Sequence, residues 1–291
     1  MATVAVARAE RQIVARPTID RALLRAFLER DRLFAAYAIC DLDDREFRRT
    51  RWGVAFDRAE PIAVGLEYSG ISPQPVFLMG EPEGIAAILR DVIRPRAAFV
   101  ATRPEHVDAV SSHYRLEPGP PMVRMWVNAE RFRRYPSAAV VRLDAADAPD
   151  LNRLYGLGFG AWLPPRSVAE GVYFGIRLNG RLVSAAGTHV VSRVARLAVV
   201  GNVLTHADHR GRGYATATTG AVTAALLQIC DAVVLNVRAD NPAAINAYRR
   251  LGYAEHVRFD ERLARRIAAP WSEALAAVVR RFTTRKESPP A

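Results

Sequence analysis

Lysine, cysteine and long apolar segments are scarce in this chain of 291 residues. Lys286 is the only lysine, so the formal net charge of +11 comes almost entirely from arginine. Cys40 and Cys230 are the only cysteines, and neither belongs to a C-x-x-C pair. This spacing argues against a metal site and a disulfide scaffold, and it favours a reducing compartment. No apolar run approaches the roughly 20 residues that a membrane span needs.

The N-terminus also lacks the features of a secretory signal. Met1 to Ala15 contains charged residues of both signs and no continuous apolar core. We therefore expect a cytoplasmic protein with no metal and no membrane partner. A nucleic-acid-binding domain concentrates its positive charge on one face with aromatic residues between, whereas these arginines occur in every segment, as at Arg21, Arg124 and Arg280. We expect no nucleic-acid partner, although the surplus charge favours anionic ligands.

The length and the apolar content suit two domains. Half of the residues are hydrophobic, so each half can bury a core. The arginine-rich segment from Ala129 to Pro136 has little to bury, and we place the domain boundary there. We predict a flexible N-terminus at residues 1–16, a first domain at 17–130, a second domain at 137–262, and a C-terminal helix with a tail at 263–291. The helix around Trp271 has an apolar face, which packs either on the chain itself or in a homodimer.

Both halves repeat one order of predicted elements: a hairpin, a strand, a helix, a strand, a helix and a closing strand. This repetition indicates an α/β (α+β) architecture and a distant duplication. The hairpin of the second half turns at Asn179-Gly180, since both positions of such a two-residue turn need positive φ. The other ranges predicted in the first half are Trp52–Phe56, Pro61–Tyr68, Val76–Met79, Glu81–Val92, Ala97–Ala101, Glu105–Tyr114 and Met122–Asn128. Those of the second half are Ala138–Leu143, Ala146–Leu157, Ala195–Thr205, Tyr214–Ile229, Ala232–Val237, Pro242–Leu251 and Tyr253–Phe259.

A loop rich in arginine and glycine follows the strand that ends at Thr205. Its sequence is His209-Arg210-Gly211-Arg212-Gly213-Tyr214-Ala215. Glycines let the backbone approach a ligand closely, and the next helix directs its free N–H groups and the positive end of its dipole at the loop. The pattern favours phosphate binding; a plain surface turn and an RNA-binding arginine-glycine patch are the alternatives. In the first half, Met79 to Gly84 occupies the same place, and its acidic turn with a proline is poor at holding phosphates.

A second motif lies downstream. Val233 to Tyr253 resembles the second cofactor-site motif of the GNAT N-acetyltransferase superfamily, and Thr205 to Ala215 resembles its pyrophosphate loop. The resemblance covers residues 138–260, and the layout with a degenerate first half is also similar to glycine N-acyltransferase-like proteins. It implies two tandem GNAT-like domains, each a mixed, mostly antiparallel twisted sheet flanked by helices. It also implies a catalytic second domain that uses acetyl-CoA or another acyl-CoA.

The resemblance further implies roles for single residues. Main-chain groups of Val203, Leu204 and Thr205 would pair with the pantetheine arm. Asn241 would hydrogen-bond the pantetheine region, and Tyr248 would lie near the thioester sulfur and protonate the thiolate. Asn241 is also a natural helix N-cap, and Tyr248 has the spacing of a core residue. The pyrophosphate would bind main-chain N–H groups of His209, Arg210, Gly211, Arg212, Gly213, Tyr214 and Ala215.

The sequence departs from the family where a general base is expected. Ala195–Thr205 contains no glutamate, although many relatives use one there to help deprotonate the amine. His189, His206 and Glu170 are the candidates, and a chain of water molecules is an equal alternative. Asp208 and Ala207 also differ from the common loop residues, which main-chain binding tolerates. Trp162, Leu163 and Pro164 lie on the loop where relatives build the acceptor pocket, and a position in the core is the alternative for the tryptophan.

Three functions follow. The leading one is an acyl-CoA-dependent N-acyltransferase that transfers an acyl group to a primary amine, on a small molecule or a protein, by direct attack in a ternary complex. The second is a non-catalytic acyl-CoA-binding sensor or regulatory protein, which the missing glutamate motivates. The third is an arginine-rich nucleic-acid-binding protein. The pattern specifies neither the amine nor the length of the acyl chain.

Overall fold

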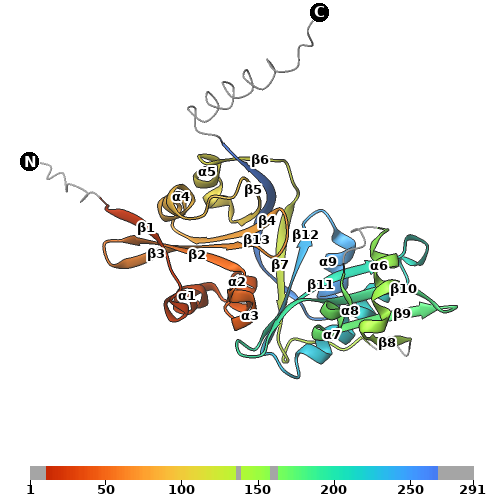
Figure 1. Ribbon diagram of the computed structural model, residues 1–291. Coiled ribbons are helices and arrows are strands. Elements are labelled where there is room, and N and C mark those ends of the chain that lie inside the picture. Colours follow the sequence, from red (N-terminus) through yellow and green to blue (C-terminus); the bar gives the residue numbers. More distant parts are fainter. Residues whose placement is uncertain (1–10, 136–138, 158–162, 268–291) are drawn as a thin grey trace, which may run out of the picture.

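A computed structural model describes residues 11–135, 139–157 and 163–267 of the chain (Figure 1). Within these residues, the strands form one continuous 13-stranded sheet that runs through both halves of the molecule. Helices cover both faces of this sheet (Figure 1). The mixed, mostly antiparallel α/β fold that we expected is confirmed.

In the first half, each strand from β1 to β4 pairs antiparallel with the next, and β5 pairs parallel with β4. Its strands are β1 (Ile13–Pro17), β2 (Thr50–Asp57), β3 (Glu60–Tyr68), β4 (Gln74–Gly80), β5 (Ala97–Thr102), β6 (Tyr114–Leu116) and β7 (Pro121–Val127). Its helices are α1 (Arg21–Leu28), α2 (Ala36–Cys40), α3 (Asp44–Phe47), α4 (Pro82–Asp91) and α5 (Val107–Ser111).

The second half has the same plan, with β11 and β12 as its parallel pair. Its strands are β8 (Val140–Leu143), β9 (Tyr173–Leu178), β10 (Arg181–Ser192), β11 (Leu197–Thr205), β12 (Ala232–Arg238) and β13 (Ala254–Arg266). Its helices are α6 (Ala148–Tyr155), α7 (Pro165–Glu170), α8 (Tyr214–Leu226) and α9 (Pro242–Arg250).

The two halves exchange their closing strands at the centre of the sheet. β13, the last strand of the second half, pairs with β5 of the first half, whereas β7 of the first half pairs with β12 of the second. β7 and β13 also pair with each other, so the order there is β5-β13-β7-β12 (Figure 1). The domain division that we placed at residues 129–136 remains a prediction, and the hydrogen bonding of the sheet crosses it.

The core explains why helices of the first half reach the second. One hydrophobic cluster joins Phe34 and Trp52 of the first half to Val199, Val234 and Phe259 of the second. These side chains are almost completely buried, and each contributes roughly 1.5–3 kcal/mol from the removal of apolar surface from water. α2 packs directly on β10 and β11 as part of this layer. A separate cluster joins α8 and α9 to β7, β11 and β12.

The predicted hairpin is confirmed, since Asn179 has a φ of 48° and Gly180 a φ of 76°. The prediction of a loose N-terminus up to residue 16 was wrong for β1, because Ile13 and Ala15 pack on the core while their neighbours face solvent. β13 extends to Arg266, beyond its predicted end, because β5 supplies a hydrogen-bonding partner for its charged stretch. The predicted helix Glu105–Tyr114 is shorter, and Tyr114 begins β6. The predicted helix around Trp271 lies outside the described residues.

Candidate functional site

The arginine-glycine loop lies between β11 and α8 and begins with a single turn of 3-10 helix, η4 (Ala207–His209). Gly211 and Gly213 both have a φ of 76°, in the left-handed region that costs other residues about 1–2 kcal/mol. Gly213 is the N-cap of α8, and no side chain caps this helix. The Ala217 N–H bonds to the Gly213 carbonyl at 3.0 Å, so the amides before it have no partner within the helix and are directed at the loop.

Other groups of the loop also suit an anion. His209 Nδ1 is buried and has no hydrogen-bond partner among the described residues. Arg210 folds back so that its Nε donates to the Thr205 carbonyl at 3.3 Å, and Arg212 is exposed. Free amides and a helix dipole therefore lie in a loop that also carries two permanent cations, and this combination suits a pyrophosphate.

Tyr135 is a neighbour of this loop that we did not predict. It belongs to the arginine-rich segment between the two halves, yet its hydroxyl oxygen lies 2.7 Å from where a Cβ of Gly213 would stand. The segment is fixed there because the Arg133 N–H donates to the Leu251 carbonyl at 3.0 Å. Gly252 closes this contact with a φ of 91°. The glycine at 252 was the one available signal, since it marks a close approach of two backbone segments.

A gap opens between β11 and β12 next to the loop. Their parallel pairing starts at Leu197 and ends with Val200 opposite Leu235, although β11 continues to Thr205 and β12 to Arg238. The main chain of β11 beyond Val200 therefore has no strand on its β12 side. Val203, Leu204 and Thr205 lie in this stretch, and an extended ligand could add to it as a strand does.

An irregularity in β11 marks the start of the gap. The register between β10 and β11 shifts between Ala185 and Gly187, and Asn202 of the bulged stretch has a φ of 53°. The Tyr155 hydroxyl donates to the Asn202 carbonyl at 2.8 Å, and the Asn202 amide donates to the Tyr173 hydroxyl at 3.1 Å. A positive φ at a residue other than glycine is unfavourable, so these bonds hold a strained conformation in place.

The second motif has the local structure that we predicted. The Asn241 side chain caps α9 and accepts a hydrogen bond from the Ala244 N–H at 3.1 Å. Tyr248 is almost completely buried among apolar side chains of α8 and β12, and burial raises its pKa to about 12. Its hydroxyl has no hydrogen bond to any described residue. The core position is thus established, and the contact with a sulfur atom remains a prediction.

The structure separates the candidate bases. Glu170 is exposed and pairs with Arg45 and Arg166, which hold the pKa of its carboxyl below the usual value. His206 is the N-cap of η4, and its Nδ1 accepts from the Asp208 N–H at 3.3 Å. His189 lies on β10 beside the bulge, with its Nε2 3.2 Å from Asn202 Oδ1 and its Nδ1 2.6 Å from the hydroxyl of Tyr37. His189 therefore lies beside the start of the gap, whereas His206 follows its far end at Thr205.

The predicted acceptor loop is described in part. Leu163 is buried and packs against α6. Pro164 is the N-cap of α7, a helix that we did not predict. Trp162 lies outside the described residues.

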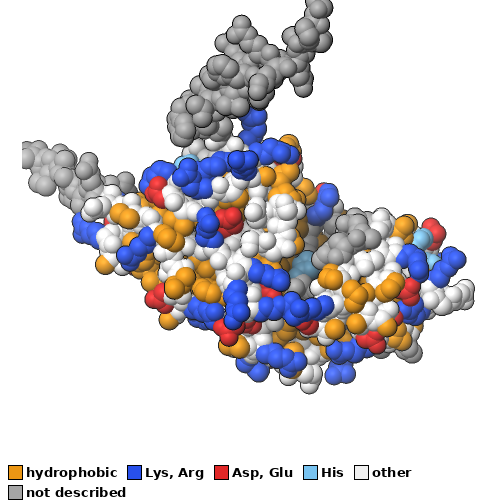
Figure 2. Space-filling view, viewed as in Figure 1, with side chains coloured by type: hydrophobic (Ala, Val, Ile, Leu, Met, Phe, Trp, Pro, Cys, Tyr) orange, Lys and Arg blue, Asp and Glu red, His pale blue; other side chains and the backbone are white. Residues whose placement is uncertain are grey.

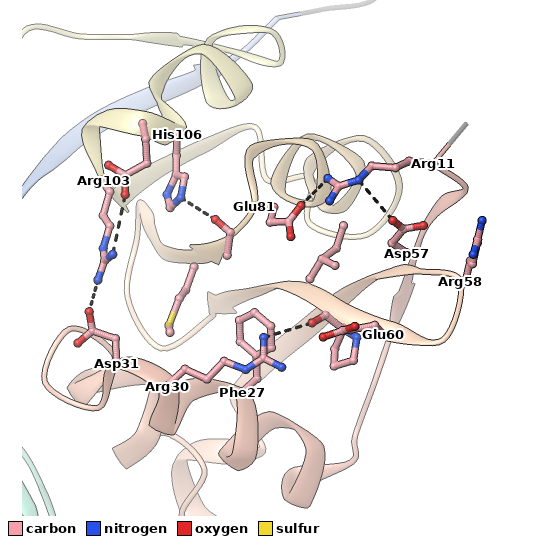
Figure 3. A pocket seen from close by; sticks show the side chains of 15 residues that line it. Arg11, Phe27, Arg30, Asp31, Asp57, Arg58, Glu60, Glu81, Arg103 and His106 are labelled. Carbon is pink, nitrogen blue, oxygen red and sulfur yellow. Dashed lines mark hydrogen bonds and ion pairs between the residues drawn. The ribbon is translucent and has the colours of Figure 1, made fainter. Parts of the chain in front are cut away.

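The first half has a cavity of about 810 Å³ in the place that corresponds to the arginine-glycine loop (Figure 3). Gly80 ends β4 there, and Glu81 is the N-cap of α4. Figure 3 shows Arg11 directed at Glu81 and Asp57. The lining contains five carboxylates, and a carboxylate at the helix N-terminus repels phosphate. These are Asp31, Asp57, Glu60, Glu81 and Glu105.

Two further observations concern the described part of the chain. No group of three or more His, Cys, Asp or Glu side chains there is placed to hold a metal ion. None of the helices there has the length and apolar character that crossing a membrane requires.

Comparison with known proteins agrees with this geometry. The model of the acetyltransferase (GNAT) family matches residues 139–253. A Drosophila protein superposes with a TM-score of 0.64 at 15% identity, over 88% of this chain and 99% of its own. A GCN5-related N-acetyltransferase from Sphaerobacter thermophilus gives 0.57 at 15% identity, over 88% and 96%. A tandem GNAT protein from the clavulanic acid biosynthesis pathway gives 0.52 at 14% identity, over 89% and 99%. None of the curated proteins matches the chain.

Proposed function

Residues 139–253 are a domain of the GNAT acetyltransferase family, and we propose from this premise that the chain is an acyl-CoA-dependent N-acyltransferase. The observation that supports it best is the juxtaposition of the uncapped N-terminus of α8 with the open edge of β11. A pyrophosphate at the first and an extended pantetheine arm along the second describe one continuous ligand. Acetyl-CoA is the acyl donor that we propose.

The proposed binding follows the residues of the loop and the gap. Main-chain groups of Val203 to Thr205 pair with the pantetheine arm, and Asn241 reaches the same arm from the start of α9. Amides from His209 to Ala215 hold the pyrophosphate. Tyr135 adds a hydroxyl group beside Gly213. The main chain thus makes most of the contacts, which explains why Asp208 and Ala207 are tolerated.

The proposed reaction is direct attack of a primary amine, on a small molecule or a protein, on the thioester carbonyl in a ternary complex. It needs a neutral amine, a donor for the developing oxyanion and a proton for the departing thiolate. We assign the second to a main-chain N–H at the bulge near Val203. The Tyr248 hydroxyl supplies the third, and its raised pKa keeps it protonated at neutral pH.

An acyl-CoA-binding sensor without catalysis is the second candidate. The specific observation in its favour is that β11 contains no glutamate. A nucleic-acid-binding protein fits less well, because the visible face shows arginines scattered over both halves with acidic side chains among them (Figure 2). We propose a cytoplasmic location, which the two free, buried cysteines support.

A titration with acetyl-CoA tests the proposal. Binding to the folded state alone stabilises it by about 2.7 kcal/mol at a concentration 100 times the dissociation constant, so the melting temperature should rise. An unchanged melting temperature at millimolar acetyl-CoA would exclude both the enzyme and the sensor. Release of free CoA thiol in the presence of a panel of primary amines then separates the two, because a sensor releases none with any amine.

A further inference from the structure

Tyr37, on helix α2 of the first half, lies over the point where β11 and β12 separate. The first residues beyond the last pair are Gly201 on β11 and Asn236 on β12. The His189 imidazole covers Gly201 so closely that a Cβ there would collide with it. On the other side of the gap, Arg124 Nε donates to Asn236 Oδ1 at 2.7 Å.

Tyr37 contacts the groups on both sides. Its hydroxyl oxygen is 2.6 Å from His189 Nδ1, and its ring lies 5.4 Å from the Arg124 guanidinium. Arg124 Nη1 also donates to the carbonyls of Leu33 and Phe34, at 3.1 and 2.6 Å, and so fixes the segment that leads into α2. The tyrosine of the first half therefore spans the mouth of the gap in the second half.

The hydrogen bonds around His189 agree with a single neutral tautomer. Tyr173 donates its proton to the Thr188 carbonyl, and Asn202 Nδ2 donates to the Tyr173 oxygen. Asn202 Oδ1 is therefore the acceptor of the proton on His189 Nε2. The lone pair on His189 Nδ1 is left to accept the proton of Tyr37. The tautomer follows from the network, in which every donor then meets an acceptor.

The surroundings of His189 favour its neutral form and leave the residue exposed to solvent. Its side chain is exposed to solvent, and the protein atoms around it nevertheless lower the pKa of the imidazole. Burial raises the pKa of Tyr37, which keeps the hydroxyl protonated. The titratable and charged groups around this pair are Arg124 on β7, Tyr173 on β9, Cys40 on α2, Asp41 after α2 and Glu261 on β13.

We propose that Tyr37 and His189 form a two-residue proton relay that deprotonates the acceptor amine, so that the degenerate first half supplies part of the catalytic site. This inference rests on the proposed acyltransferase function. The Tyr37 oxygen accepts a proton from the ammonium group of the acceptor while its own proton moves to His189 Nδ1, which gives an imidazolium. Asn202, whose side chain bonds Nε2, is a positioning residue.

The remaining bonds then change without another reactant. The freed amine nitrogen forms a bond with the acyl carbon and loses its second proton to solvent, and the carbon–sulfur bond breaks. The thiolate leaves with the electron pair and takes a proton from Tyr248, which solvent restores. The imidazolium releases the relayed proton to solvent through its exposed side. The products are an amide and free CoA.

Tyr37→Phe tests the relay, because it removes the hydroxyl group and keeps the aromatic ring on α2. Tyr114→Phe is the matched control, since Tyr114 is a buried tyrosine of the first half whose hydroxyl donates to the Pro95 carbonyl at 3.0 Å. We expect Tyr37→Phe to lower kcat for amine acetylation by on the order of 100-fold, the range of a lost acid–base group. The rise in melting temperature with acetyl-CoA should be unchanged. Equal kcat values for the two variants would overturn the relay.

The pH profile gives a second readout. Wild-type kcat/KM should rise with pH through one ionisation below 6.5, and His189→Gln should remove that limb while it still binds acetyl-CoA. A limb that persists in His189→Gln would show that another group is the base. If the wild type neither binds acetyl-CoA nor releases thiol, the acyltransferase function itself is wrong, which is a different result from an active enzyme insensitive to Tyr37→Phe.

A spectroscopic measurement needs no acceptor. Nitrogen-15 NMR of the histidines should show His189 as the neutral tautomer with its proton on Nε2. A hydrogen bond to the neutral form disfavours protonation, so Tyr37→Phe should raise the pKa of His189 and Tyr114→Phe should leave it unchanged. A proton on Nδ1, or an equal pKa in all three proteins, would contradict the proposed pair.

Discussion

Gly213→Ala tests the phosphate loop most sharply when it is compared with Gly180→Ala. Both glycines have a φ of 76°, and Gly180 lies in the β9–β10 turn. Alanine in the left-handed region costs about 1–2 kcal/mol, so each variant should lose that much free energy of unfolding in urea. A Cβ at residue 180 meets no atom within 4 Å, whereas a Cβ at residue 213 lies 2.7 Å from the Tyr135 hydroxyl oxygen. The Tyr135 hydroxyl is at the end of a side chain, so a small movement of that side chain relieves the contact.

The two variants should differ in ligand binding. A methyl group at Gly213 stands at the N-cap of α8, where the free amides converge, and it displaces an anion from at least one of them. A hydrogen bond to a charged group contributes about 1.5–3 kcal/mol, which corresponds to roughly a 10- to 150-fold weaker affinity. Calorimetry with acetyl-CoA should show this loss for Gly213→Ala and wild-type affinity for Gly180→Ala. Equal affinities in the two variants would refute the role of the helix terminus.

Four further changes have defined outcomes. Tyr248→Phe should lower kcat for thiol release by on the order of 10- to 100-fold at unchanged acetyl-CoA affinity. An equal loss of kcat and of acetyl-CoA affinity would indicate a packing role. Asn241→Ala should cost about 1 kcal/mol of unfolding free energy through the lost cap and also weaken acetyl-CoA binding; a change in stability alone would leave only the cap. Arg124→Met should destabilise the fold by about 1–3 kcal/mol in urea, because one buried and two part-buried acceptors lose their donor. The lowered pKa of His189 means that the unfolded chain binds its proton first, so stability decreases as pH falls below 6.5; His189→Gln should flatten this slope, and an unchanged slope would show that other groups cause it.

Local features of this fold could be predicted from the sequence because short stretches determine them. Asn179-Gly180 specifies its turn through positive φ, and Asn241-Pro242 specifies the start of α9. The loop at Gly211 and Gly213 is similarly local, since its conformation depends on the absence of side chains. These are the parts where residue type and backbone conformation correspond directly.

The pairing across the two halves could not be predicted in this way. β7 and β13 each have an ordinary strand pattern, and nothing in that pattern tells which of two similar sheets will accept them. The contact between Tyr37 and His189 depends on this exchange and on the position of α2. The two residues are 152 positions apart in the chain. Tyr37 has the spacing of a core residue on a short helix, so its position over the gap gives no signal in the sequence.

The exchanged strands have a consequence for how the molecule can be divided. Each half completes its sheet with a strand covalently attached to the other half, as in a swapped dimer whose subunits have been joined end to end. A protease that cut between Tyr135 and Ala139 would sever the chain without releasing either piece, because the β5–β13 and β7–β12 seams would still hold them. The unit of folding is therefore the pair, and complementary fragments cut at this point should reassociate into the intact structure.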